Sequence, residues 1–143
     1  MRRVVVVHGP NLNLLGKREP HIYGTRSLDD LNRFVSENAK ELDFEVSAFQ
    51  SNHEGEIIDF LQKQGPGSVG IVINPGALSH YSLAIYDCLQ ALALPVVEVH
   101  LSNIHAREEF RSKSITARAA RGVITGLGFK GYELALRYLA EEK

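Results

Sequence analysis

Two polar residues in an otherwise apolar segment have the types and the spacing of a proton-transfer pair. Glu98 and His100 lie two positions apart within Pro95 to Leu101, so in an extended strand both side chains project from the same face. A carboxylate so placed holds one imidazole nitrogen and leaves the other for proton transfer, which predicts a general acid or base oriented by Glu98. The spacing is equally compatible with a satisfied polar pair at the end of a strand.

Arg18 and Tyr23 share one loop, which is flanked by Gly16 and Gly24 and is able to fold over a ligand. A tyrosine is a weak base, because its reference pKa near 10 makes deprotonation at neutral pH cost about 4 kcal/mol. A guanidinium about 4 Å away at an effective dielectric near 20 supplies an interaction of about that size. The pair predicts a base, Tyr23, activated by Arg18. The alternative is that Tyr23 anchors the loop and Arg18 is solvated.

Asparagines and an arginine follow the strand-like segments. Asn11, Asn74 and Asn103 each stand next to a Pro or a Ser, where turn formation alone explains an asparagine. Arg111 follows Phe110 in a short charged segment. Its planar guanidinium suits a carboxylate, although most exposed arginines bind no ligand. For these residues the sequence leaves both the turn interpretation and the ligand-binding interpretation open.

Common nucleotide and metal motifs are absent from the sequence. No P-loop pattern and no Rossmann glycine fingerprint follows the first strand, because Pro10 stands where such loops need a backbone donor. Cys88 lies at helical spacing from Ala84, Ala91 and Leu92, so packing explains it better than nucleophilic chemistry. The histidines show no zincin spacing, which argues against a metal site. They are His8, His21, His53, His80, His100 and His105.

These residues need a scaffold, and hydrophobic patterning predicts one. Short β-branched runs alternate with segments of helical periodicity, and most runs are apolar on both faces, which is typical of a parallel sheet covered by helices on both sides. The expected strands are residues 4–7, 44–49, 69–73, 95–101 and 123–125. Five such units without repeats or a linker predict one doubly wound α/β domain. Ligands of such sheets lie beyond the carboxyl ends of the strands, where the chemistry-bearing residues fall.

Helix signals separate the strands. Ser27 is an expected N-cap with Asp30 in the capping-box position, and Ser51 with Glu54 repeats that signature. The glycine-rich segment 126–131 is expected to be a tight turn into the last helix rather than a phosphate loop. The helices are expected to include residues 28–42, 57–61, 82–92 and 132–139.

Composition restricts the class of protein. The chain has 143 residues, and 16 Lys and Arg against 17 Asp and Glu give a net charge of −1, so a broad surface for nucleic acid or anionic lipid is not expected. A single cysteine forms no internal disulfide and no Cys-based zinc site, which indicates a reducing compartment. Apolar runs fall far short of the roughly 20 residues that span a bilayer, and the chain starts with no signal-peptide pattern, so we expect a cytoplasmic protein.

Four stretches together resemble a known family. They are HGPNLNLLGKREPHIYG, QSNHEGEIIDFLQ, INPGALSHYSLAIYD and VVEVHLSNIHAREEFRSKS. In this order they are similar to type II 3-dehydroquinate dehydratase, and the similarity covers essentially the whole chain. It implies a flavodoxin-like, three-layer α/β/α fold with residues 1–143 as a single domain. It also implies a hydro-lyase that converts 3-dehydroquinate to 3-dehydroshikimate, without metal or organic cofactor, in the shikimate pathway of aromatic amino acid biosynthesis.

The resemblance assigns the proton transfers to residues already singled out. Tyr23 would take the proton beside the substrate ketone, with Arg18 lowering its pKa, and an enolate would form. An ordered water held near Asn11 would stabilise this enolate. His100, oriented by Glu98, would then protonate the departing hydroxyl in an anti elimination.

The resemblance also implies substrate contacts and an assembly. The groups that would grip the substrate are Asn74, His80, the backbone amides of Leu101 and Ser102, and Arg111. A homododecamer built from trimers is implied, in which Asp87 of a neighbouring subunit reaches toward the site. The sequence departs from the family pattern at Tyr81, Ser112, Lys113 and the segment 115–121. These departures bear on substrate affinity and subunit contacts rather than on the proposed catalytic residues.

Two other functions compete with the lyase. The fold alone would serve a non-catalytic flavodoxin-like module that binds a nucleotide or a regulatory partner, although no phosphate loop follows the first strand. His100 and Glu98 with a serine such as Ser102 would make a hydrolase, but no strained nucleophile elbow is present. The partner expected for the lyase is the small molecule 3-dehydroquinate, with neither nucleic acid nor membrane.

Overall fold

One parallel sheet runs through the centre of the molecule. The computed structural model describes residues 1–17, 19–23 and 25–142, with Tyr23 described by its backbone alone. The strands are β1 (Arg2–His8), β2 (Phe44–Gln50), β3 (Gly70–Asn74), β4 (Val96–His100) and β5 (Gly122–Thr125). Their order is β2-β1-β3-β4-β5, and every neighbouring pair is parallel. All the predicted strands are confirmed, with small differences at their ends.

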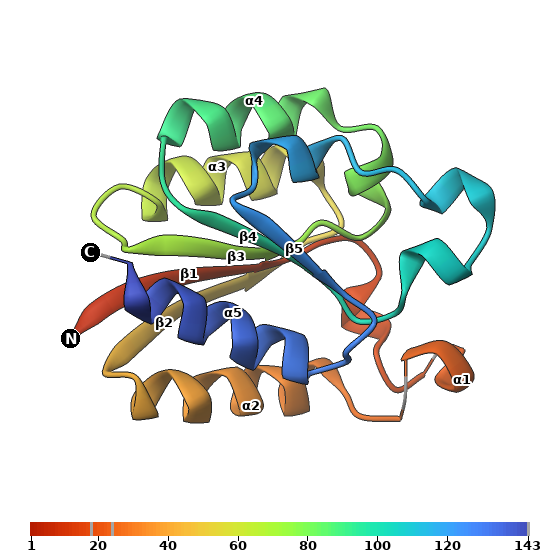
Figure 1. Ribbon diagram of the computed structural model, residues 1–143, viewed down its shortest axis with the longest axis horizontal. Helices are drawn as coiled ribbons and strands as arrows, with labels where there is room; N and C mark the ends of the chain where they lie inside the picture. The colour runs from red at the N-terminus through yellow and green to blue at the C-terminus, as the bar shows by residue number, and fades with distance from the viewer. Residues whose placement is uncertain (18, 24, 143) are drawn as a thin grey trace.

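Helices cover both faces of the sheet. The long ones are α2 (Leu28–Glu41), α3 (Glu54–Gln64), α4 (Leu83–Leu92) and α5 (Lys130–Glu141). Figure 1 shows α3 and α4 on one face and α2 and α5 on the other. The doubly wound, three-layer architecture predicted from the sequence is therefore confirmed.

Polar caps fix where two of these helices begin. The hydroxyl of Ser27 accepts the N–H of Asp30 at 3.1 Å, and the Asp30 carboxylate accepts the N–H of Ser27 at 2.9 Å, which completes the predicted capping box. Ser82 caps α4 in the same way by accepting the N–H of Ile85 at 3.0 Å. These bonds satisfy backbone donors that have no partner inside the helix.

The predicted capping box of Ser51 and Glu54 is wrong. The N-cap of α3 is His53, and Glu54 is the first helical residue. Ser51 instead accepts the N–H of His53 at 2.9 Å and donates to the carboxylate of Glu56 at 2.5 Å. A serine two residues before the cap makes a local turn with the same residue types, so the pattern placed the helix start too early.

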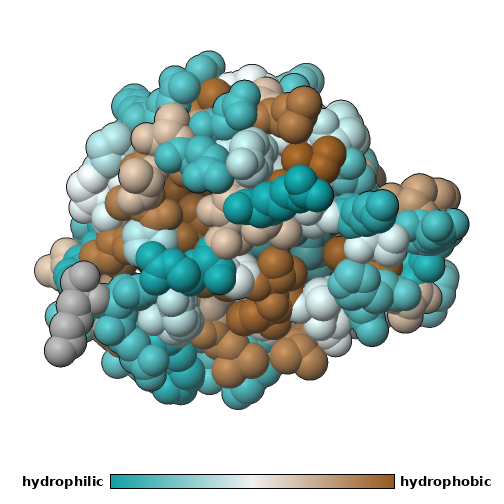
Figure 2. Space-filling model, turned by 45° about the horizontal axis from the view of Figure 1, so that its top comes forward, coloured by the Kyte–Doolittle hydropathy of each residue, from teal (hydrophilic) through white to brown (hydrophobic). Residues whose placement is uncertain are grey.

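The core lies in two layers on either side of the sheet. Along β1 the side chains alternate, so Val4 and Val6 pack in the layer under α2 and α5 while Val5 and Val7 pack under α3 and α4. Cys88 is buried in the second layer, which confirms its packing role. On the face drawn in Figure 2, patches of apolar side chains lie between hydrophilic ones. In the described part of the chain, no helix has the length and apolar character needed to cross a membrane.

The carboxyl ends of β1, β3 and β4 lead into short turns before the chain reaches its next long helix or strand. After β1 come a 3-10 turn at Leu12–Leu14 and the short helix α1 (Pro20–Tyr23), and after β3 a 3-10 turn at Gly76–His80. The loop after β4 contains turns at Ile104–Ala106, Glu109–Arg111 and Thr116–Ala119. Because the strands are parallel, the segments that directly follow β1, β3 and β4 gather at one edge of the sheet. The turn Thr116–Ala119 instead packs against α4 and leads to the amino end of β5.

Candidate active site

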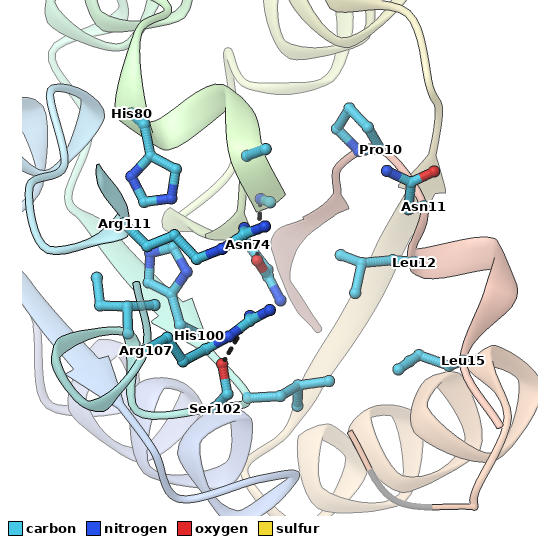
Figure 3. A pocket seen from close by; sticks show the side chains of 14 residues that line it. Pro10, Asn11, Leu12, Leu15, Asn74, His80, His100, Ser102, Arg107 and Arg111 are labelled. Atoms are coloured by element: carbon cyan, nitrogen blue, oxygen red, sulfur yellow. Dashed lines mark hydrogen bonds between the residues drawn. The ribbon is translucent and has the colours of Figure 1, made fainter. Parts of the chain in front are cut away.

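A pocket opens at this edge, beyond the ends of β1, β3 and β4. It has a volume of about 110 Å³, and its walls come from the three loops that follow these strands (Figure 3). β1 pairs with β2 on one side and with β3 on the other, so the direction in which the sheet is wound reverses here. Doubly wound folds bind their ligands at this switch point. We therefore take the pocket as the candidate active site.

Glu98 and His100 form a buried pair at the end of β4. The Nε2 atom of His100 donates to the Glu98 carboxylate at 2.8 Å, and Glu98 is fully buried. The same carboxylate accepts hydrogen bonds from the hydroxyls of Ser114 at 2.6 Å and Thr116 at 2.5 Å. Because Nε2 is engaged by Glu98, Nδ1 is the ring nitrogen of His100 that can exchange a proton with a ligand in the pocket.

The loops after β1 and β3 fit tightly against each other. The N–H of Gly9 donates to the Asn74 carbonyl oxygen at 2.7 Å, and a Cβ at Gly9 would lie 2.4 Å from the carbonyl oxygen of Pro75. Any side chain at Gly9 would push the two loops apart. This close approach fixes the pocket wall that carries Asn74.

Asn74 and His80 are held by backbone groups. Asn74 is almost fully buried, and its Oδ1 atom accepts the N–H of Gly76 at 3.1 Å. The Nδ1 atom of His80 donates to the carbonyl oxygen of Lys113 at 2.7 Å, which leaves Nε2 of His80 as an acceptor. Both side chains line the pocket, as expected for residues that contact a ligand.

Arg111 and Arg107 bring positive charge to the pocket. Arg111 was expected there, and its Nε atom lies 3.2 Å from the Glu108 carboxylate. The pKa of Glu108 lies below its ordinary value, mainly because its own backbone N–H donates to it and also because Arg111 and Arg107 are close. Arg107 donates to the Ser102 hydroxyl at 3.4 Å and lies 3.9 Å from the carboxylate of Glu19. Arg107 lies in the same charged segment as Arg111 and has the same guanidinium group, but the sequence analysis selected only Arg111.

The loop after β1 carries the remaining predicted residues. Arg18 and the side chain of Tyr23 lie outside the described residues, so their predicted roles stay predictions. Asn11 has a left-handed backbone with φ of 70°, and its N–H donates to the side-chain oxygen of Asn52 at 2.9 Å. Figure 3 places the Asn11 side chain across the pocket from His100. Asn11 therefore combines a turn conformation with a place in the site.

Leu101 and Ser102 also line the pocket. The Leu101 carbonyl accepts the N–H of Gly128 at 3.0 Å, and the Ser102 carbonyl accepts the hydroxyl of Thr125 at 2.9 Å. In a trans peptide the N–H points opposite to the C=O, so the N–H of Ser102 points away from Gly128. Asn103 follows as the N-cap of the next turn and accepts the N–H of His105, in agreement with a turn role.

Asp87 and the departures from the family pattern at Tyr81, Ser112 and Lys113 lie around the pocket rather than in it. The segment 115–121 differs, because its Thr116 donates to the Glu98 carboxylate, so the expectation that this segment does not bear on the proposed catalytic residues is wrong. Asp87 is exposed on α4, outside the pocket of its own chain. Tyr81 is 64% exposed at the end of the turn after β3. Ser112 donates to the Glu109 carbonyl at 2.7 Å, and Lys113 reaches the site through the backbone oxygen that holds His80.

Sequence reasoning missed the two hydroxyls that hold Glu98. Ser114 and Thr116 lie 16 and 18 residues after Glu98 and return to it because the loop after β4 folds back on the strand. Their alternating spacing matches that of Glu98 and His100, which is a weak signal without knowledge of the loop path. Across the described residues, no group of three or more His, Cys, Asp and Glu side chains is placed to hold a metal ion.

Fold and site together define a flavodoxin-like α/β domain with a buried carboxylate–imidazole pair and arginines in a small pocket at its switch point. Comparison with known proteins agrees: the chain belongs to the family described as Dehydroquinase class II, which it matches over residues 2–140. The 3-dehydroquinate dehydratase of Halothermothrix orenii is 59% identical over 136 residues, which cover 95% of this chain and 92% of that protein. The enzyme of the same name from Caldicellulosiruptor bescii is 55% identical over 142 residues, covering 99% of this chain and 98% of that protein.

A solved structure shows the same fold. The type II dehydroquinase from Propionibacterium acnes superposes with a TM-score of 0.94 at 46% identity, over 98% of this chain and 97% of its own. The family resemblance and the fold expected from it are confirmed.

Proposed function

We propose that the protein removes water from 3-dehydroquinate to give 3-dehydroshikimate. Membership in the class II dehydroquinase family and the names of its relatives support this reaction. The observation that carries the proposal for this chain is the pair of Glu98 and His100, 2.8 Å apart, in a pocket that Arg111 also lines. A proton donor close to a guanidinium suits a carboxylate-bearing substrate that loses a hydroxyl group.

Tyr23 is the proposed base. Its phenolate takes the proton from the carbon beside the ketone, and the electron pair of that C–H bond forms an enolate on the ketone oxygen. Arg18 makes the phenolate accessible at neutral pH, because one nearby guanidinium offsets roughly the cost of deprotonating a tyrosine. The ion pair between Arg107 and Glu19 supports this placement, since it holds the residue next to Arg18 against the pocket.

The enolate is stabilised by hydrogen bonds from the wall formed by the loop after β1. Asn11 holds an ordered water there, and its position across the pocket from His100 supports this role. Preorganised donors near a developing negative charge lower the barrier because they need no rearrangement during the reaction.

His100 is the proposed acid. When the enolate collapses, the C–O bond of the departing hydroxyl breaks, and the proton of the imidazolium goes to that oxygen, so water leaves. The base and the acid act from opposite faces of the substrate, which gives an anti elimination. The carboxylate of Glu98 stabilises the imidazolium, and the hydroxyls of Ser114 and Thr116 keep that carboxylate in place.

The other predicted residues bind the substrate. Arg111 pairs with the substrate carboxylate, while Asn74 and His80 bond its hydroxyls. The backbone amides of Leu101 and Ser102 complete the grip. Support comes from their common position in the pocket and from the fixed orientation of Asn74 and His80.

The proposal includes a homododecamer built from trimers, with Asp87 of a neighbouring subunit at the site. Asp87 and Leu83 are one turn apart on α4 and therefore lie on the same face. Leu83 is 63% exposed and nearby Tyr81 is 64% exposed, so this face presents apolar surface that a second copy would cover. We place the enzyme in the cytoplasm, in the shikimate pathway, and the free buried Cys88 fits a reducing compartment.

A direct assay tests the proposed reaction. The purified protein is expected to convert 3-dehydroquinate to a product with the absorbance of a conjugated enone. Chelator and borohydride should leave the rate unchanged, since the mechanism uses no metal and no lysine Schiff base. Light scattering measures the subunit number in the same preparation. No turnover, combined with a thermal shift for a flavin or a nucleotide and none for 3-dehydroquinate, would overturn the proposal.

A further inference from the structure

The stretch QSNHEGEIIDFLQ, residues 50–62, contains none of the residues that the proposed reaction uses. It begins where β2 ends, and the pairing of His8 with Gln50 places the ends of β1 and β2 side by side. The chain segments that follow these two strands therefore leave the sheet next to each other. Gln50 and Asn52 make hydrogen bonds from this stretch to the loop after β1, which carries Asn11.

Asn52 and Gln50 hold the backbone on the amino side of Asn11. The Oδ1 atom of Asn52 accepts the N–H of Asn11 at 2.9 Å and a proton of Gln50 Nε2 at 3.2 Å. Because Nε2 of Gln50 carries two protons, it also donates to the carbonyl oxygen of Gly9 at 3.2 Å. The N–H of Gly9 in turn donates to the Asn74 carbonyl at 2.7 Å. The backbone that leads into Asn11 is thus fixed from the side of β2 and from the side of β3.

The backbone conformation of Asn11 needs this support. Its φ of 70° lies in the left-handed region, which is unfavourable for residues with a side chain, although asparagine adopts it more readily than most. Asn11 is also the N-cap of the 3-10 turn Leu12–Leu14, yet its side chain makes no cap hydrogen bond to the described residues of that turn. An N-cap asparagine normally uses its side-chain oxygen for such a bond. The Asn11 side chain is left to line the pocket instead (Figure 3).

Ser51 fixes the turn that presents Asn52. Ser51 is buried, and its N–H donates to the carbonyl oxygen of His8 at 3.1 Å. Its hydroxyl accepts the N–H of His53 at 2.9 Å and donates to the Glu56 carboxylate at 2.5 Å. The residues on both sides of Asn52 are therefore anchored to the end of β1 and to the first turn of α3.

We infer that Gln50 and Asn52 are positioning residues for the proposed reaction, because they hold the left-handed turn that places the Asn11 side chain at the pocket. Among the residues that the structure describes, Asn11 lines the pocket and neither Gln50 nor Asn52 does, so both act through Asn11. Groups held in place before the reaction stabilise a developing charge best, since they need no rearrangement. This inference rests on the proposed function, in which Asn11 holds the water that stabilises the enolate.

Removal of the Asn52 acceptor tests the inference. In Asn52→Ala, kcat for 3-dehydroquinate is expected to fall about tenfold while KM changes about twofold at most, because the enolate charge develops only on the way to the transition state. Gln50→Met keeps the length of the side chain without its amide donor and is expected to act in the same direction. Asn38→Ala is the matched control, because this asparagine donates to the Phe34 carbonyl within α2 at 2.8 Å. It should leave both constants unchanged.

A double-mutant cycle separates positioning from a general loss of stability. Asn11→Gly removes the side chain and keeps the turn, because glycine adopts positive φ without strain. In this background, Asn52→Ala is expected to lower kcat no further, since the group through which Asn52 acts is gone. An equal loss of kcat in both backgrounds, or no loss in either, would overturn the inference.

Hydrogen–deuterium exchange of the Asn11 amide, followed by mass spectrometry, tests the positioning without the reaction. Exchange should be about tenfold faster in Asn52→Ala than in the wild type and unchanged in Asn38→Ala. Asn52→Asp keeps an acceptor oxygen in place and should keep the slow exchange. If the wild type does not act on 3-dehydroquinate, the proposed function fails, and the exchange rates still decide whether Asn52 holds Asn11. Equal exchange in the wild type and a folded Asn52→Ala protein would refute the positioning role.

Discussion

The proposed acid and the proposed base lie in two regions that are held in place by different interactions. On the acid side, Glu98 is fully buried at the end of the central strand β4 and accepts three hydrogen bonds from other side chains. On the base side, the loop after β1 carries the short helix α1 with exposed Pro20, and an ion pair at 3.9 Å joins its Glu19 to Arg107. The proposed acid is thus held by several hydrogen bonds within the sheet, whereas a partly exposed ion pair joins the loop of the proposed base to the loop after β4. Apart from the two proton-transfer groups themselves, changes to the residues that hold the acid should lower kcat, and changes to the ion pair that holds the loop should first raise KM.

Removal of either proton-transfer group has the largest expected effect. His100→Ala and Tyr23→Phe should each lower kcat by about 10² to 10⁴-fold, the usual contribution of general acid–base catalysis, while circular dichroism shows a folded protein. Steady-state enone absorbance measures the loss. His105→Ala is the control, because this exposed histidine lies in the same loop as the acid side. Full activity in Tyr23→Phe would exclude Tyr23 as the base, and the proposed mechanism would then keep only His100 as the acid.

Low pH should weaken the folded state through His8, which is fully buried at the end of β1. Burial lowers the pKa of His8 from 6.5 to about 4, so between these values the unfolded chain binds a proton that the folded chain does not. The contribution of His8 to the free energy of unfolding is therefore fully present above the unfolded pKa. It is lost as the pH falls from the unfolded pKa to the folded pKa, a loss of about 3 kcal/mol in total, and His8 causes no further loss at lower pH. Urea unfolding at several pH values measures the slope. His8→Phe should flatten it, and His53→Gln, which changes an exposed histidine, should leave it intact; equal slopes in wild type and His8→Phe would contradict the prediction.

Sequence patterns predicted the strands and the local contacts well, for a physical reason. Strands alternate their side chains with a period of two, so the common face of Glu98 and His100 followed directly from their spacing. The capping box of Ser27 was equally local. The start of α3 was placed too early, because Ser51 makes a turn that uses the same residue types as a cap.

Long-range contacts of the loops could not be predicted in this way. Thr116 meets Glu98 only because the loop after β4 returns to its own strand, and no local pattern sets that path. Arg107 and Arg111 have the same chemistry in sequence, and only the fold shows that both line the pocket. His8 was considered only as a metal ligand, since its bond to Tyr132 joins residues 124 positions apart. The proposed substrate came from the family resemblance, because the chemistry of the pocket residues alone does not identify it.

Thr116→Val tests whether the acid side is held as firmly as its hydrogen bonds suggest. The change keeps the shape and removes one donor to the buried Glu98 carboxylate, and a bond to a charged group is worth about 1.5–3 kcal/mol. We expect kcat to fall about tenfold with KM nearly constant. Ser68→Ala removes a buried hydroxyl that bonds the backbone at the amino end of β3 and should leave kcat unchanged. A rise in KM without loss of kcat would mean that Thr116 orders the pocket wall instead of the acid.

Glu19→Gln probes the loop side and should have the smallest effect. Its ion pair with Arg107 is partly exposed, and such pairs contribute at most about 1 kcal/mol, so KM should rise about twofold to fivefold while kcat stays constant. Trypsin cleavage at Lys17 or Arg18 should slow in the wild type when a substrate-like carboxylate is bound, and this protection should weaken in Glu19→Gln. Glu108→Gln is the matched variant, because Glu108 contacts the same arginine at 3.8 Å from within the loop after β4. Glu108→Gln should alter KM without altering the protection from trypsin, since Glu108 does not join the two loops.

Equal cleavage with and without ligand would show that the loop after β1 does not close over the site. The two sides of the site would then not differ in the way proposed.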